Sequence, residues 1–257
     1  MVALRRPGVG LVALGVGAYL VFLLVNLPAA WLGFALERAS GGALALGEPG
    51  GTLWKGRGVL GMRSGAAYAR VAGIEWSCNP LSVFTGRLNI TLSGSDHETQ
   101  LRASVSLGAS TVRLQNVEAC VPAALLEAAM SAAAFAKPDG SLRVKAESVE
   151  LGEAWARGAA SAEWIDAGLS GMQAPRLGDY RLQIDAKGDR ADLKLATLRG
   201  DLRLSGEGEW RASRPRVVQL RGTAEVAAER KDLETLLRVM GARGVGASQA
   251  FSWTLPI

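Results

Sequence analysis

The sequence predicts a mainly β protein, in which an N-terminal transmembrane helix precedes a curved antiparallel sheet with meander topology and about two short helices. Three observations support this fold class. Residues 9–36 carry no charged side chain. In the rest of the chain, apolar and polar residues alternate with a period of two in one segment after another, which is typical of strands with one buried and one wetted face. Turn-forming residues separate these segments, for example at 93–96 and 137–140, as hairpins require.

The first element is an apolar run from Val9 to Val25, and uncharged sequence continues to Leu36. This length is sufficient to cross a bilayer core, which takes about 20 residues in a helix. We therefore expect residues 9–36 to form a transmembrane signal anchor and its exit. The alternative is a cleaved signal peptide, which has a shorter apolar core and ends at a small-x-small site.

Charged residues on either side of this run predict its orientation. Arg5 and Arg6 precede it and Glu37 follows it. By the positive-inside rule, residues 1–8 stay in the cytoplasm and the chain after the span is exported. Residues 37–257 are accordingly expected to be a β-rich periplasmic domain.

The alternating segments place their apolar side chains on one face of the predicted sheet. The clearest of these residues are Leu88, Ile90, Leu92, Leu182, Ile184, Leu202 and Leu204. If two short helices leave this face uncovered, it is a groove for a hydrophobic ligand such as a lipid. If the sheet curls on itself, the same face is an ordinary core. The sequence leaves both readings open.

Two segments after the first have helical patterns. Residues 121–134 are rich in alanine, and residues 229–240 place their leucines on one stripe. Each follows a predicted strand, and strands containing tryptophan lie upstream of each. These similarities suggest two repeated sub-units, at residues 50–136 and 140–241.

Cys78 and Cys120 are the only cysteines, and neither belongs to a C-x-x-C motif. In an exported protein, the expected use of two cysteines is one structural disulfide. Two free buried thiols are the alternative, because the sequence does not give the geometry that a disulfide needs.

A glycine-rich stretch from Glu48 to Leu60 has some features of a phosphate-binding loop. In that loop a lysine and a hydroxyl residue follow the second glycine, whereas here Lys55 precedes Gly56 and an arginine follows it. We therefore expect a glycine turn that leads into a strand, with Trp54 packing on the apolar face of the sheet.

Little in the sequence indicates catalysis, and we expect no enzyme and no cofactor. His97 is the only histidine and lies in a polar turn, whereas a catalytic triad assembles from separate segments. Too few metal-binding side chains occur for a zinc site. The net charge of +5 is spread along the chain without clustering with aromatic residues, so nucleic acid is not an expected partner.

The segment GGTLWKGRG, which follows the apolar run, resembles the type II secretion system protein N family. The most specific part of this resemblance is G-T-L-W-x-G, formed by Gly51, Thr52, Leu53, Trp54 and Gly56. The later segments SAEWIDAG, LGDYRLQI and LRLSGEGEW extend it over most of the chain. The resemblance implies an inner-membrane protein with one N-terminal span and a periplasmic β-rich domain.

By the same resemblance, the protein is a non-enzymatic component of the machine that carries folded proteins from the periplasm across the outer membrane. Its expected partners are the inner membrane and other subunits of the secretion system. The alternative from another class of function is a periplasmic protein that binds or transfers a lipid in an apolar groove of its sheet.

Overall fold

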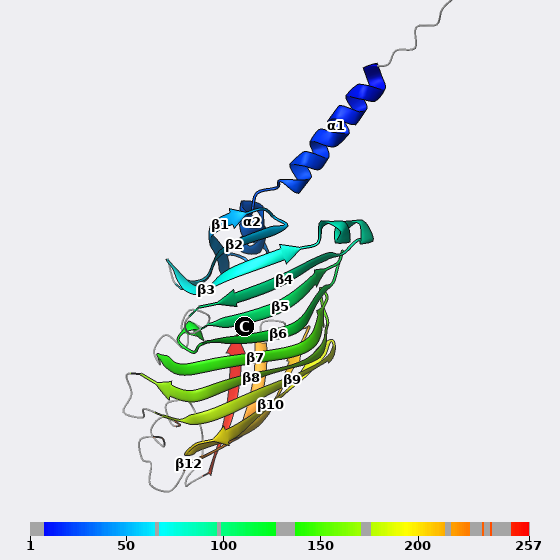
Figure 1. Cartoon of the computed structure of the whole chain (residues 1–257). Coiled ribbons are helices and arrows are strands. Elements are labelled where there is room, and N and C mark those ends of the chain that lie inside the picture. The colour runs from blue at the N-terminus through cyan, green and yellow to red at the C-terminus, as the bar shows by residue number, and fades with distance from the viewer. Residues whose placement is uncertain are drawn as a thin grey trace, which may run out of the picture.

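Thirteen strands form one antiparallel sheet in a computed structural model of the chain (Figure 1). Every strand lies beside its neighbours in the sequence, so the predicted meander is confirmed. The sheet runs without interruption through both segments that resemble repeats, and the repeat itself stays a prediction. The structure describes residues 8–64, 67–96, 99–126, 137–170, 176–213, 217–226, 233, 237 and 248–256.

The strands follow the alternating segments of the sequence, because successive side chains on a strand point to opposite faces. A short 3₁₀ helix, η1 (Pro80–Thr85), connects β3 to β4. The strands are β1 (Leu44–Gly51), β2 (Lys55–Ser64), β3 (Ala67–Cys78), β4 (Leu88–Ser95), β5 (Gln100–Leu107), β6 (Val112–Pro122), β7 (Pro138–Leu151), β8 (Ala156–Leu169), β9 (Gly178–Gly188), β10 (Arg190–Arg199), β11 (Leu202–Arg211), β12 (Val217–Val226) and β13 (Ser248–Pro256).

The uncharged N-terminal region forms two helices, α1 (Gly8–Val25) and α2 (Ala30–Ala39). They are separated at Pro28, which disfavours helical geometry in the residue before it. The sequence did not predict α2, which packs against β1. Helix α1 projects from one end of the sheet (Figure 1). Among the described residues, no helix combines the length and the apolar character that a membrane span requires.

The two helices expected after the N-terminal region are described only in part. In the first, Leu125 and Leu126 are helical, and residues 127–136 lie outside the described part of the chain. In the second, Leu233 and Leu237 are the two described residues, and both are helical and fully buried.

The sheet rolls up, so that β12 and β13 lie behind the middle strands (Figure 1). Its inner, concave face carries the apolar side chains. The register places all seven of the predicted apolar-face residues on this face, because each belongs to one row of paired residues or lies an even number of residues from a member of that row on the same strand. That row contains Ile74, Gly94, Leu101, Ala119, Val144, Ala162, Leu182, Leu195, Gly206, Gly222 and Phe251.

Candidate functional site

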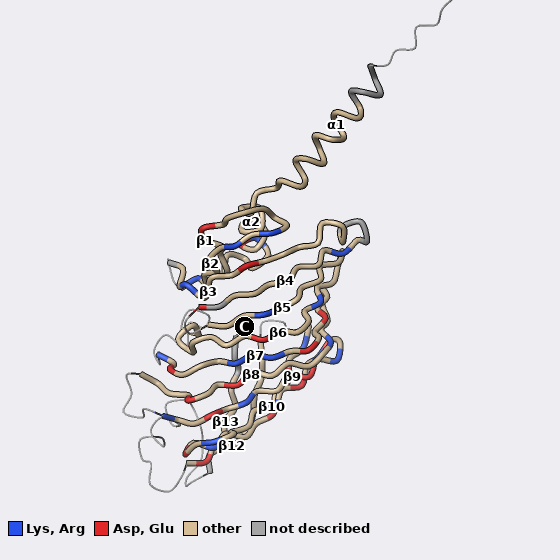
Figure 2. Tube along the Cα trace, viewed as in Figure 1, with Lys and Arg blue, Asp and Glu red and all other residues tan. Residues whose placement is uncertain are grey.

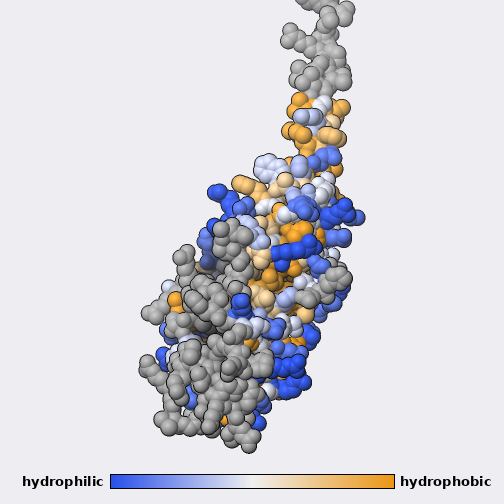
Figure 3. Space-filling model, turned by 90° about the vertical axis from the view of Figure 1, so that its left-hand side faces the viewer, coloured by the Kyte–Doolittle hydropathy of each residue, from blue (hydrophilic) through white to orange (hydrophobic). Residues whose placement is uncertain are grey.

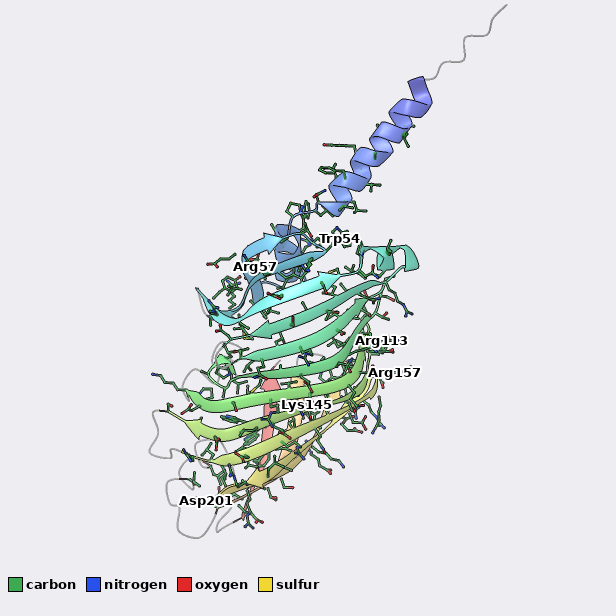
Figure 4. All side chains as sticks on the ribbon, viewed as in Figure 1. Trp54, Arg57, Arg113, Lys145, Arg157 and Asp201 are labelled. Atoms are coloured by element: carbon green, nitrogen blue, oxygen red, sulfur yellow. The ribbon has the colours of Figure 1, made fainter. Side chains whose placement is uncertain are left out.

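The turn between β1 and β2 holds the chain where it leaves α1. The Trp54 indole N–H donates a hydrogen bond of 2.8 Å to the carbonyl of Leu24, in the last turn of α1. The last carbonyls of a helix have no partner within the helix, so Trp54 satisfies one of them. The backbone N–H of Leu53 donates to the carbonyl of Leu27 at 2.7 Å. Trp54 therefore lies between the helix and the sheet (Figure 4), and we call this region the junction.

The turn in the junction is closed by the residues of the family-like motif. The backbone N–H of Lys55 donates to the hydroxyl of Thr52 at 3.2 Å, and the N–H of Thr52 donates to the Lys55 carbonyl at 2.9 Å. Gly51 has a φ of +91°, a conformation that favours glycine. Gly51 and Thr52 are thus used to form the turn.

Gly56 allows a tryptophan ring to lie directly on the backbone. A Cβ atom at this position would come within 2.4 Å of the Trp76 ring and 2.6 Å of the carbonyl oxygen of Gly50. Trp76 is 2% exposed, and its indole N–H donates to the carbonyl of Leu53 at 3.1 Å. The glycines of this stretch therefore serve close packing and turn formation, and their environment is not that of a phosphate loop.

Replacing Trp54 with phenylalanine should lower the free energy of unfolding by about 1 kcal/mol, since an aromatic ring is kept but the Leu24 carbonyl loses its donor. Urea denaturation of the full chain in detergent measures this loss. Trp31→Phe is the matched control, because the exposed Trp31 ring lies on the adjacent helix; it should change stability by less than about 0.5 kcal/mol. Equal losses in the two variants would contradict a role for the indole N–H.

Two adjacent rows of the concave face, one crossing β5–β10 and the other β6–β10, form what we call the apolar trough. The first row contains Leu101, Ala119, Val144, Ala162, Leu182 and Leu195. The second contains Val117, Ala146, Ala160, Ile184 and Leu193. All but Leu193 are only half-buried. The middle of both rows consists of alanine and valine, so the floor of the trough is low.

The concave face is covered at the two ends of the trough. At the end near α1, Trp76 and Ile74 are buried, and Leu32 of α2 packs against them. At the other end, Leu237 and Phe251 are buried in a second cluster that also contains Leu202. The apolar face is therefore an ordinary core at both ends, while its middle is partly open.

Charged residues recur along most strands of the sheet (Figure 2), and the register places them on the outer face, because they alternate with the residues of the apolar row. Glu163 lies between two arginines, at 2.7 Å from Arg181 and 3.8 Å from Arg143. Such partly exposed pairs contribute about 0–1 kcal/mol each. A hollow of about 730 Å³ lies on this face, where Arg57 and Lys145 come from opposite ends of a row of alternating charge (Figure 4). The other charged residues that line it are Glu48, Glu75, Arg102, Glu118 and Arg143.

The charged side chains described on this face form ion pairs at the surface, as Glu163 does with Arg181. Within the described ranges, no three His, Cys, Asp or Glu side chains lie close enough together to hold a metal ion. His97 lies outside the described residues.

Cys78 and Cys120 are free thiols, so the expected disulfide is not formed. Cys78 lies on the concave face of β3, where it pairs with Ile90, and Cys120 lies on the outer face of β6, where it pairs with Arg143. Three strand spacings, about 14 Å, lie between their strands, and Cys120 is also displaced along β6 from Leu114, the residue in the row of Cys78, whereas a disulfide needs Cα atoms within about 7 Å. The expectation failed because the sequence does not reveal that the two residues belong to opposite faces.

We expect the two thiols to differ in reactivity. Burial raises the pKa of the Cys78 thiol, which reduces the thiolate that reacts with alkylating agents. N-ethylmaleimide should therefore modify Cys120 first in the folded protein and reach Cys78 only in denaturant. Mass spectrometry of the labelled peptides over time measures the order, and equal rates at both sites in the folded protein would contradict it.

A buried tyrosine in the cluster far from α1 predicts a loss of stability in alkali. The Tyr180 hydroxyl donates to the carbonyl of Leu202 at 3.0 Å. Burial, followed by the nearby charges of Asp179 and Asp201, raises the pKa of Tyr180 above its usual range. In the unfolded chain the phenol ionises near pH 10, so the stability it contributes is complete below about pH 10 and is lost as the pH rises toward the folded pKa.

Urea denaturation between pH 8 and pH 11 measures this effect as the difference in stability between wild type and Tyr180→Phe. We expect wild type to be more stable by about 1 kcal/mol at pH 8, because of the hydrogen bond to Leu202. The difference should shrink as the pH rises above about 10. A difference that stays constant up to pH 11 would contradict the raised pKa.

Comparison with curated proteins and with solved structures finds no match. A family model described as type II secretion system (T2SS), protein N, matches residues 42–249. This range extends from the end of α2 through β1–β12 to the start of β13. It therefore includes the junction motif and the whole of the apolar trough. The chain belongs to the type II secretion system protein N family.

Proposed function

We propose that this protein is a non-enzymatic component of the type II secretion apparatus that is tethered to the inner membrane and binds other subunits through its periplasmic sheet. Membership of the family carries the first part, a component of the apparatus. The tether, the periplasmic location of residues 37–257 and the binding surface are our proposal. The observation that carries the binding surface is the uncharged edge strand at the end of the sheet.

The tether is supported by the surface of α1. Large apolar side chains are exposed around this helix, among them Leu14, Tyr19 and Phe22. A helix that is apolar on all sides is typical of an apolar environment such as a bilayer. On α2, Trp31 and Phe34 are also exposed, and aromatic side chains are enriched at membrane interfaces.

A topology reporter at the C-terminus tests the orientation of this tether. We expect a fused alkaline phosphatase to be active, because our proposal places the sheet and the C-terminus in the periplasm, where this enzyme folds. A fusion active only as a cytosolic reporter would contradict both the tether and the export of the sheet.

The binding surface is supported by β13. Among the described strands, β13 pairs with β12 alone, so its other side is an edge of the sheet. Its sequence, SQAFSWTLP, has no charged residue. Edge strands of soluble proteins are usually protected by lysine, bulges or short length, because their free N–H and C=O groups pair with strands of other chains. An unprotected edge is suited to the addition of a strand from a partner subunit.

Lysine substitutions at this edge test the proposal. Ala250 and Ser252 are exposed on the outer face of β13. We expect Ala250→Lys/Ser252→Lys to reduce crosslinks to other secretion subunits in cells by at least about tenfold, because lysine on an edge opposes strand addition. Secretion of folded substrates should fall with it.

The matched control places the same two lysines one strand further in. Gln219→Lys/Thr223→Lys lies on the outer face of β12, where both residues are exposed. This variant should crosslink and secrete like wild type. If the edge variant folds, keeps its crosslinks and supports secretion, the edge is not the binding surface.

A further inference from the structure

The apolar trough has the chemistry of a hydrocarbon site. Both of its rows consist of alanine, valine, leucine and isoleucine, so none of its side chains can donate or accept a hydrogen bond. An extended peptide segment lying there would bury N–H and C=O groups without partners, which is costly. A hydrocarbon chain has no such groups. The side chains of the trough therefore favour an alkyl chain over an extended protein segment, and a helix, which pairs its own backbone groups, is the other occupant that the test below distinguishes.

The shape of the trough also fits a single long chain. Its floor is low at Ala146, Ala160 and Ala162, whereas the neighbouring row on one side carries Trp164 and Tyr180. These two rings lie 6.4 Å apart and form a higher wall. Because six strands at about 4.8 Å spacing cross it, the trough is about 24 Å long. Its long axis follows the order of the strands and leads away from α1 (Figure 1).

The source of such a chain is indicated by the apolar surface between α1 and the sheet. Figure 3 looks onto the side of the rolled sheet, and hydrophobic residues gather there in an interrupted strip that begins at α1 and continues down the sheet, with hydrophilic residues beside and between them. At the end near α1, the strip passes the junction, where Trp54 joins α1 to β2. The trough begins at β5, two strands beyond the strand that carries Trp76, and so it lies near the surface that we place in the bilayer, with the buried cluster around Trp76 between the two.

From these observations we propose that the apolar trough binds one acyl chain of a membrane phospholipid, taken from the bilayer that holds α1. This binding site is separate from the β13 edge that we propose for partner subunits. The acyl chain lies across β5–β10 with its hydrocarbon against the alanine floor. The trough residues other than Leu193 are only half-buried, and the acyl chain would cover their exposed surface.

A photoreactive phospholipid tests this site. The full chain is reconstituted in vesicles of phosphatidylethanolamine and phosphatidylglycerol that contain a phospholipid with a diazirine on one acyl chain. After illumination, mass spectrometry maps the labelled residues. We expect label on α1 and, in addition, on the concave-face residues of β6–β9.

Two glutamates on one strand give the matched comparison. Ala160 lies in the trough and Ala159, the preceding residue, is exposed on the outer face of β8. In Ala160→Glu, labelling of the trough should fall by at least about tenfold, because a carboxylate is not desolvated against hydrocarbon. Labelling of α1 should not change, and Ala159→Glu should behave like wild type.

A second variant covers the case in which Ala160→Glu does not fold. Ala162→Trp fills the trough with an apolar ring, and it should also reduce trough labelling while circular dichroism shows an intact sheet. Label confined to α1 in the wild-type protein would mean that the trough is closed or filled by protein, and would overturn the proposal. Equal trough labelling in folded Ala160→Glu and Ala159→Glu would overturn it as well.

Discussion

Replacing Trp76 with alanine should lower the free energy of unfolding by about 3–5 kcal/mol, the usual cost of removing a large buried aromatic side chain. Trp76 is 2% exposed and belongs to the cluster at the end of the sheet near α1. Its ring rests on the backbone at Gly56, and its indole N–H bonds the Leu53 carbonyl. The substitution removes the packing and the donor together, and so it also loosens the turn that holds α1.

Urea denaturation of the full chain in detergent measures this effect, followed by circular dichroism of the sheet. Ser77→Ala is the control, because Ser77 is the next residue on β3 and is exposed on the opposite face. It should change stability by less than about 0.5 kcal/mol. A Trp76→Ala protein within 1 kcal/mol of wild type would show that the junction is not part of the cooperative fold.

The second large effect is expected at the other end of the sheet, where Phe251→Ala should also cost about 3–5 kcal/mol. Phe251 is buried and stacks on Trp253 with ring centroids 4.1 Å apart. Its ring lies over two glycines of the neighbouring strands, Gly206 and Gly222, at positions where a Cβ atom would collide with it or approach it closely. Truncation removes the side chain that covers these glycines and leaves a cavity in the cluster.

Thermal and urea unfolding give the size of this loss, with Ser252→Ala on the outer face of β13 as the control. Because Phe251 lies on the edge strand, the substitution should also release β13 from β12. Faster hydrogen exchange at the amides of β13 would report that release. Unchanged exchange in β13, together with wild-type stability, would contradict the role of the ring.

The meander and its apolar face could be predicted because a strand repeats every two residues, and this signal is local. Leu88, Ile90 and Leu92 lie on one strand, and Leu182 and Ile184 on another, with the spacing that the sequence shows. Turn residues then fix consecutive strands as neighbours. Even so, the alternation is interrupted at Asn116, where a φ of +49° and a shift in register move the following residues to restore the apolar face.

The features of the junction and of the thiols depend on contacts between distant segments, which a local pattern does not contain. The hydrogen bond from Trp54 to Leu24 spans thirty residues of sequence. Helix α2 was read as a continuation of the apolar run, because its leucine and aromatic residues resemble those of a span. The sequence left a disulfide between Cys78 and Cys120 open for a related reason, because alternation within one strand does not show which residues of another strand share its face.

Pairing of every strand with its sequence neighbours has a consequence for how the protein is made. If the chain is exported from its N-terminus, each strand emerges directly after the strand with which it pairs. The sheet can therefore grow one hairpin at a time, in the order in which the strands are translocated. No segment has to wait for a distant partner to be delivered. At every stage of this growth the newest strand has unpaired N–H and C=O groups that can pair with the next strand, and β13 is the last strand that the structure describes.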